Sequence, residues 1–166
     1  GFPCAVALRY EAMVRQGVHA LKFYNQPQRA RVFARYLAQA AAEQFPGGFD
    51  AVTFVPVSLW RNYRRGYDQA RLLAEEAAKL WGVRAEPTLR KTRNNRPQSS
   101  VKTAAERRAN VLDVYDVPHP ERVAGRRFLL VDDVLTTGST MAACARRLMD
   151  AGAESVVCAA LAGAEK

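Results

Sequence analysis

Hydrophobic and polar residues follow two different spacings along this chain, and the switch between them predicts helices interleaved with strands. Amphipathic or helix-favouring stretches predict helices at residues 10–22, 27–44, 67–80, 103–110 and 140–151. Short apolar runs predict strands at residues 51–55, 83–89, 126–131 and 154–161. Pro87 marks the second of these as an edge or bulged strand, because proline cannot donate a hydrogen bond to a neighbouring strand.

Two of the predicted strands contain uninterrupted apolar runs, at residues 128–131 and 156–161. Such runs are typical of strands covered on both faces, as in parallel sheets. With the helix at 140–151 between them they form a βαβ unit. The sequence therefore predicts an α/β fold with a mostly parallel central sheet and helices on both faces. We expect a single domain over residues 1–166, with an N-terminal helical part at 1–45 and a core at 46–166.

The junction between the strand at 126–131 and the following helix carries the strongest chemical signal. Two carboxylates follow the strand, and a loop with four hydroxyls and one glycine then leads into the helix; the residues are Asp132, Asp133, Thr136, Thr137, Gly138, Ser139 and Thr140. A helix N-terminus presents unpaired N–H groups to an anion, and a glycine allows the backbone to approach it closely. The loop is therefore interpreted as a phosphate-binding site.

The adjacent acids would repel a phosphate if they faced it. They are explained if Asp132 and Asp133 accept hydrogen bonds from vicinal hydroxyls or help to hold a divalent cation. Together with the loop they indicate a site for a ribose 5-phosphate. The simpler alternative is that Asp133 or Thr137 caps the helix and Asp132 is a solvated strand end. The segment lacks the endings of a nucleotide-binding P-loop and of a dinucleotide-binding loop.

Positive charge is concentrated in the middle of the chain. The formal net charge is +9, and residues 61–108 hold thirteen Lys and Arg against five Asp and Glu. A local excess of this kind attracts phosphates, pyrophosphate or nucleic acid, although it can also be a solvated surface. Single-stranded DNA is therefore a candidate partner of this segment.

Three cysteines, Cys4, Cys144 and Cys158, show no paired spacing, so we expect neither a disulfide framework nor a zinc site. The last two lie in apolar segments, as buried cysteines do. No stretch is long and apolar enough to span a membrane, and no signal-peptide pattern is present, so we expect a cytoplasmic protein. The chain starts at Gly1 without a methionine, and we expect its natural start to lie upstream.

The segment VDDVLTTGST at residues 131–140 resembles the phosphoribosyl pyrophosphate (PRPP) signature of type I phosphoribosyltransferases. The rest of the chain is similar to the competence-associated ComF family, through HALK at 19–22, VPV at 55–57, RRGYDQ at 64–69, and Tyr10, Arg107 and Asn110. The family usually has Phe and Asn where this chain has Tyr67 and Asp68. Many members carry an N-terminal zinc ribbon, of which only Cys4 could remain here.

The resemblance implies a type I phosphoribosyltransferase fold with a small hood, a flexible loop at 92–102, and Mg²⁺ as the cofactor. By analogy, Asp132 and Asp133 bind the ribose hydroxyls and, indirectly, the metal, and residues 136–140 bind the 5-phosphate. Pyrophosphate would face Arg64, Arg65 and Gly66, although these residues could also form a basic surface turn. Asp132, Asp133 and Arg65 are the residues expected to act in catalysis.

Thr136 stands where purine-salvage relatives often have an aspartate proposed as a general base, which makes hypoxanthine–guanine salvage a poor candidate. Three hypotheses remain open. The protein transfers phosphoribosyl from PRPP to an acceptor that the sequence does not name, or it handles nucleic acid during DNA uptake, with PRPP binding regulatory or vestigial. Alternatively it senses PRPP for other proteins, such as those of the competence machinery.

Overall fold

The computed structural model describes residues 1–9, 29–57, 68–92, 114–135 and 137–163. The helices predicted at 10–22 and 103–110 lie outside these residues, and so does most of the loop predicted at 92–102.

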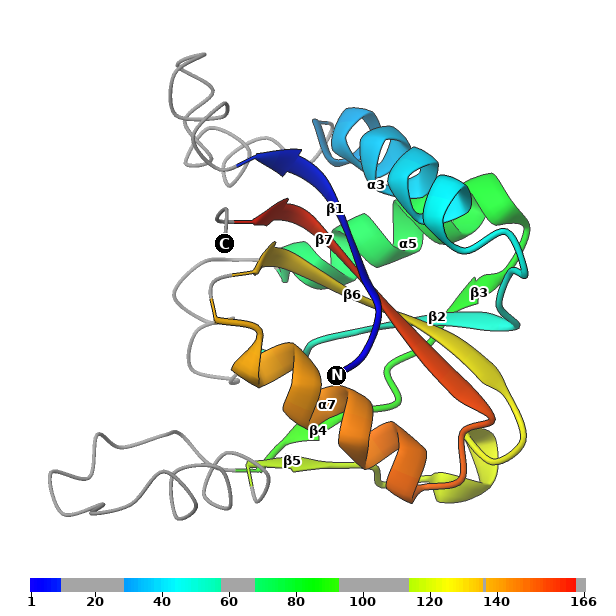
Figure 1. Ribbon diagram of the computed structural model, residues 1–166. Helices are drawn as coiled ribbons and strands as arrows, with labels where there is room; N and C mark the ends of the chain where they lie inside the picture. Colours follow the sequence, from blue (N-terminus) through cyan, green and yellow to red (C-terminus); the bar gives the residue numbers. More distant parts are fainter. Residues whose placement is uncertain (10–28, 58–67, 93–113, 136, 164–166) are drawn as a thin grey trace, which may run out of the picture.

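A central sheet of five parallel strands forms the middle layer of the molecule (Figure 1). Its order is β1-β7-β6-β2-β3, and every neighbouring pair is parallel. The strands are β1 (Cys4–Arg9), β2 (Ala51–Phe54), β3 (Arg84–Ala85), β6 (Arg127–Leu135) and β7 (Ser155–Gly163). This arrangement confirms the predicted α/β fold with a mostly parallel sheet.

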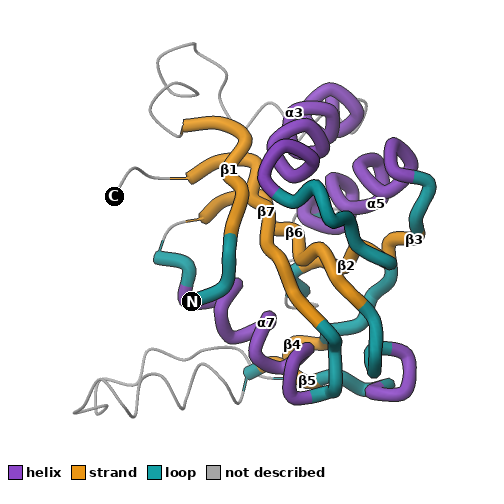
Figure 2. Tube along the Cα trace, turned by 45° about the vertical axis from the view of Figure 1, so that its right-hand side comes forward, coloured by secondary structure: helices purple, strands orange, loops and turns teal. Residues whose placement is uncertain are grey.

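Helices cover both faces of the sheet, as predicted (Figure 2). Helices α3 (Ala30–Gln44) and α5 (Gln69–Trp81) lie on one face, and α7 (Ser139–Asp150) lies on the other. Side chains of a strand alternate between the two faces, so β6 contributes to both cores. Leu129 and Val131 pack in the core beneath α3 and α5, whereas Phe128 and Leu130 pack in the core beneath α7.

A small antiparallel pair, β4 (Arg90–Lys91) and β5 (Tyr115–Asp116), lies beside α7 and precedes a short 3₁₀ helix, η2 (Pro120–Arg122). Leu89, Val114 and Tyr115 pack this pair into the core beneath α7. The strand predicted at 83–89 is therefore wrong in length, because only Arg84 and Ala85 form a strand and residues 86–89 connect it to β4 of the other sheet. Pro87 lies between β3 and β4, where neither sheet needs an N–H donor.

Residues 4–9, which the sequence pattern places in a helical N-terminal part, form the edge strand β1 instead. Each of its paired residues lies opposite a residue of β7, such as Cys4 opposite Cys158. The partner strand is about 150 residues away in sequence, so no local pattern could reveal the pairing. The helix that follows in the described residues, α3, was predicted correctly to within three residues.

Candidate functional site

The two adjacent acids lie on the part of β6 that extends beyond its neighbour β2. Pairing between these strands ends where Phe54 lies opposite Val131, with one further hydrogen bond from Val55 N to Val131 O of 2.9 Å. On its other side β6 stays paired with β7 as far as Leu135 opposite Gly163. The predicted strand end at Val131 is therefore wrong, because β6 continues beside β7 for four more residues, to Leu135. Asp132 and Asp133 project from the carboxyl edge of the sheet, where α/β proteins bind their ligands.

Both carboxylates are held against their own backbone. Asp132 Oδ1 accepts a hydrogen bond from Asp133 N, and Asp133 Oδ1 accepts one from Val134 N, each at 2.8 Å. Alternation along β6 directs Asp132 toward the α7 side of the sheet and Asp133 toward the α5 side. The pair therefore covers both sides of the strand end.

Burial raises the pKa of Asp132 well above its usual range, and the neighbouring charges of Asp133 and Asp68 raise it further. Burial also raises the pKa of Asp68, with a smaller contribution from Asp133. Three carboxylates therefore lie within electrostatic reach of one another, in a protein whose net charge is +9. Such a site favours a ligand that brings a cation or donates hydroxyl hydrogens.

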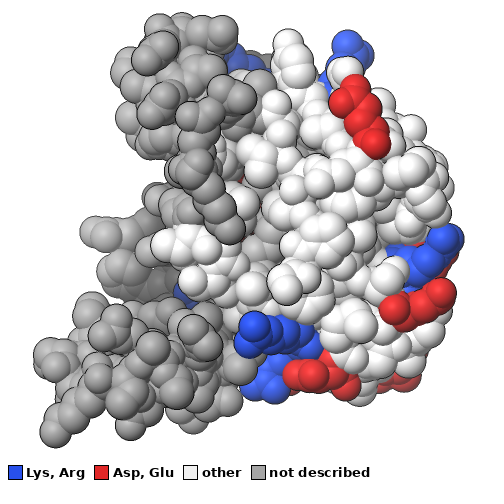
Figure 3. Space-filling model, viewed as in Figure 1, with Lys and Arg blue, Asp and Glu red and all other residues white. Residues whose placement is uncertain are grey.

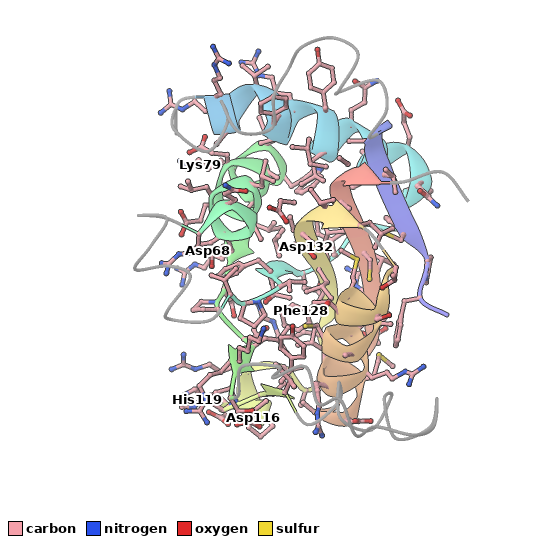
Figure 4. All side chains as sticks on the ribbon, turned by 90° about the vertical axis from the view of Figure 1, so that its left-hand side faces the viewer. Asp68, Lys79, Asp116, His119, Phe128 and Asp132 are labelled. Atoms are coloured by element: carbon pink, nitrogen blue, oxygen red, sulfur yellow. The ribbon has the colours of Figure 1, made fainter. Side chains whose placement is uncertain are left out.

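Asp68 enters the site because it is the N-cap of α5. Its backbone is extended, and its Oδ1 accepts a hydrogen bond from Arg71 N at 3.1 Å, which satisfies a first-turn amide. Figure 4 looks at the side of the molecule where the strands end, and Asp68 and Asp132 both lie there. The sequence analysis did not select Asp68 as a site residue, because it placed the helix start at residue 67 and Asp68 inside the helix, whereas α5 begins at Gln69.

The predicted phosphate loop is a tight turn between β6 and α7. Gly138 has a φ of +74°, and it is the N-cap residue of α7 with no side-chain hydrogen bond to the first turn. Thr137 Oγ1 shares a hydrogen bond of 2.9 Å with Ser139 Oγ and accepts a long one, of 3.4 Å, from Ser139 N. Thr137, Ser139 and Thr140 are exposed. The helix start therefore keeps amides and hydroxyls directed at solvent, which an anion can use.

The alternative of a helix capped by Asp133 is not what the structure shows, because the N-cap is Gly138. Of the remaining candidate residues, Arg64, Arg65, Gly66 and Thr136 lie outside the described residues. The structure therefore brings together Asp132, Asp133 and residues 137–140 at one edge, and adds Asp68.

The cysteines near the site have raised pKa values, which favour the protonated thiol. Burial, followed by the charge of Asp132, raises the pKa of Cys4 to about 11, and burial likewise raises the pKa of Cys144. All three cysteines are free, and Cys144 and Cys158 are buried in the sheet–α7 core as the sequence predicts. Within the described part of the chain, no three His, Cys, Asp or Glu side chains are grouped so as to hold a metal ion.

The helices of the described residues include none long and apolar enough to cross a membrane.

Comparison with known proteins agrees with the fold described above. Residues 19–166 match the family described as "Phosphoribosyl transferase domain". Among solved structures, the chain is similar to the glutamine PRPP amidotransferase from B. subtilis complexed with ADP and GMP, with a TM-score of 0.57 and 25% identity over 80% of this chain and 26% of that one. The chain belongs to the phosphoribosyl transferase domain family.

Its curated relatives indicate which group within this family the chain belongs to. The chain is 33% identical over 147 residues to the DNA utilization protein YhgH of Salmonella typhimurium, and 30% identical over 148 residues to competence protein F of Haemophilus influenzae. These matches cover 84% of this chain but only 62% and 63% of the relatives' own lengths. The chain is thus a ComF-family protein of the phosphoribosyltransferase type, as the sequence resemblance predicted.

Proposed function

We propose that this protein binds Mg²⁺ and PRPP at the carboxyl edge of its sheet and transfers the phosphoribosyl group to an acceptor, with release of pyrophosphate. One observation carries the proposal: the acids on the part of β6 that extends beyond β2 lie a few residues before the start of α7, whose N-cap Gly138 makes no side-chain hydrogen bond. Carboxylates that accept hydrogen bonds from a diol, beside a turn that binds phosphate, match the hydroxyls and the 5-phosphate of a ribose 5-phosphate.

The described residues have distinct tasks in this reaction. The amides and hydroxyls of residues 137–140 bind the 5-phosphate, and each hydrogen bond to a charged oxygen contributes about 1.5–3 kcal/mol. Asp132 and Asp133 accept hydrogen bonds from the ribose hydroxyls and fix the orientation of C1. The bond between C1 and the pyrophosphate oxygen breaks as a bond from C1 to the acceptor forms, and the electron pair leaves with the pyrophosphate.

The acids also fit a magnesium ion. In nucleotide sites Mg²⁺ is commonly held by one or two carboxylates, by substrate oxygens and by water, so a complete protein cage is not needed. Asp132 and Asp133 provide two carboxylates of this kind, and Asp68 adds a third negative charge nearby. The metal would neutralise the charge of the pyrophosphate as it leaves. Arg64 and Arg65 are proposed to assist in the same way.

Thermal or chemical unfolding with and without Mg-PRPP tests the binding site. A ligand at a hundredfold excess over its Kd stabilises the folded protein by about 2.7 kcal/mol. The double variant Asp132→Asn/Asp133→Asn should lose this stabilisation, and an unchanged shift would refute the site. Pyrophosphate release in a screen of nitrogenous acceptors then tests transfer; binding of PRPP with no release would instead indicate a sensor.

A second candidate function is the handling of single-stranded DNA together with competence proteins, and it is favoured by the names of the relatives and the basic segment at 61–108. The described part of this segment is not a uniform basic surface, because at least three of its five cations form ion pairs: Arg71 with Glu75, Lys79 with Glu76, and Arg90 with Asp116. Figure 3 likewise shows blue and red side chains of the described residues next to one another.

The other eight cations of the segment lie outside the described residues. If they bind DNA, affinity for a single strand should fall steeply with added salt, since each neutralised phosphate releases counterions. An affinity independent of salt would count against this function. Three free thiols accord with a reducing compartment, and we place both candidate functions in the cytoplasm.

A further inference from the structure

Gln69, the first residue of α5, carries a buried carboxamide that makes no hydrogen bond to any residue that the structure describes. Its side-chain oxygen and nitrogen are the buried side-chain polar atoms without a partner among the residues that the structure describes. The residue is only 5% exposed, so bulk water does not replace the missing partners. Buried amides are nearly always paired in folded proteins, and each exception needs an explanation.

The position of Gln69 places this amide at the carboxyl edge of the sheet. It shares a face of α5 with Leu73, one turn further along, and Leu73 packs in the same core as Phe54 and Val131, at the ends of β2 and of the paired part of β6. Helix α5 runs from this edge to the opposite one, because Arg84, just after it, pairs with Ala51 at the start of β2.

Gln69 is therefore one helical turn nearer to the edge than Leu73. Side chains of a helix tilt toward its N-terminus, which directs the amide further toward that edge. On β6 the next two residues toward the edge are Asp132 and Asp133, and Asp133 faces the α5 side. The preceding residue, Asp68, interacts electrostatically with both acids, which independently places the start of α5 beside them.

The hydrogen-bonding groups of the amide limit which kind of ligand group can pair with it. Nε2 donates and Oε1 accepts, so its partner must supply both an acceptor and a donor. A phosphate oxygen only accepts and would leave Oε1 unpaired. A vicinal diol supplies both, because one hydroxyl can accept from Nε2 while the other donates to Oε1 or to a carboxylate.

We propose that Gln69 is a ligand-binding residue that hydrogen-bonds to the ribose hydroxyls held by Asp132 and Asp133. This inference rests on the proposed function, since it concerns the same ligand. It assigns to the start of α5 the recognition of the sugar, and leaves the 5-phosphate to the start of α7 on the other face of the sheet.

The variant Gln69→Met separates a binding role from a structural one. It replaces the carboxamide by an apolar side chain of similar length, so without ligand it should be at least as stable as the wild type, because no hydrogen bond is lost. A clear loss of stability without ligand would show that the amide serves the fold, and would overturn the proposal. Gln39→Met is the matched control: Gln39 is exposed on α3 and donates only to Glu43, at 2.9 Å.

Binding is then measured with ribose 5-phosphate plus Mg²⁺ and, separately, with inorganic phosphate. Gln69→Met should weaken ribose 5-phosphate binding about tenfold, the loss expected for one or two uncharged hydrogen bonds, and should leave phosphate binding unchanged. Gln39→Met should change neither. Equal weakening of both ligands, or no weakening of either, would overturn the role of Gln69 while the proposed function stands. If the wild type binds neither ribose 5-phosphate nor PRPP, both proposals fail.

Discussion

Gly138 offers a test of the phosphate-binding turn whose magnitude follows from the structure. Its φ of +74° is a conformation that costs residues with a Cβ about 1–2 kcal/mol. A Cβ built at this position would meet only Leu135 Cδ1, at 3.7 Å, which is an ordinary contact. The cost of Gly138→Ala is therefore conformational. For a domain of this size it corresponds to a melting temperature lower by about 2–8 °C.

The same substitution should weaken binding at the turn. If the alanine relaxes toward negative φ, the amides at the start of α7 rotate away from the phosphate. Loss of one hydrogen bond to a charged oxygen, about 1.5–3 kcal/mol, corresponds to roughly 10- to 150-fold weaker binding of Mg-PRPP. Titration calorimetry measures this change directly.

Gly82 provides the matched control. It ends α5 with a φ of +65°, and a Cβ there would meet nothing within 4 Å. Gly82→Ala should therefore cost a similar stability, but it lies at the end of α5 remote from the carboxyl edge of the sheet and should leave binding unchanged. Wild-type affinity in Gly138→Ala, or an equal loss in both variants, would refute the assignment of the turn.

Three further predictions concern stability. Asp132→Asn should stabilise the protein without ligand by about 1 kcal/mol in urea denaturation, because it removes a buried charge repelled by other acids; a less stable variant would contradict this. Arg127 lowers the pKa of Asp50 to about 2, so their ion pair is complete above about pH 4 and is lost as the pH falls toward 2. The difference in melting temperature between wild type and Asp50→Asn should shrink over that range, and a constant difference would exclude this origin. Thr53 Oγ1 and Thr88 Oγ1 lie 2.6 Å apart in the interior, so Thr88→Val should lower the free energy of unfolding by about 1–3 kcal/mol, because it leaves the Thr53 hydroxyl without its partner. The double variant Thr53→Val/Thr88→Val should lose less than this, and a larger, additive loss would show that the two hydroxyls do not depend on each other.

Much of the fold follows from local patterns in the sequence. The uninterrupted apolar runs of β6 and β7 predict strands covered on both faces, and the Ser139–Asp150 helix between them was predicted to within one residue at each end. The turn proposed to bind phosphate was recognisable for the same reason, since its glycine, hydroxyls and acids lie within residues 132–140. A site whose residues are close together in the sequence can be recognised there as a motif.

Features that depend on partners distant in sequence could not be read in this way. The true end of β6 is set by β7, which pairs with it as far as Leu135, and β1 exists as a strand because β7 lies beside it. The packing of α5 on the sheet brings Asp68 near Asp132. It also buries Gln69 without a hydrogen-bond partner among the described residues. The sequence alone therefore determined which residues are candidates for binding a phosphorylated sugar, whereas only the tertiary structure decided which other side chains lie near them. Strand pairing and helix packing join residues that are remote along the chain, and no local pattern records those contacts.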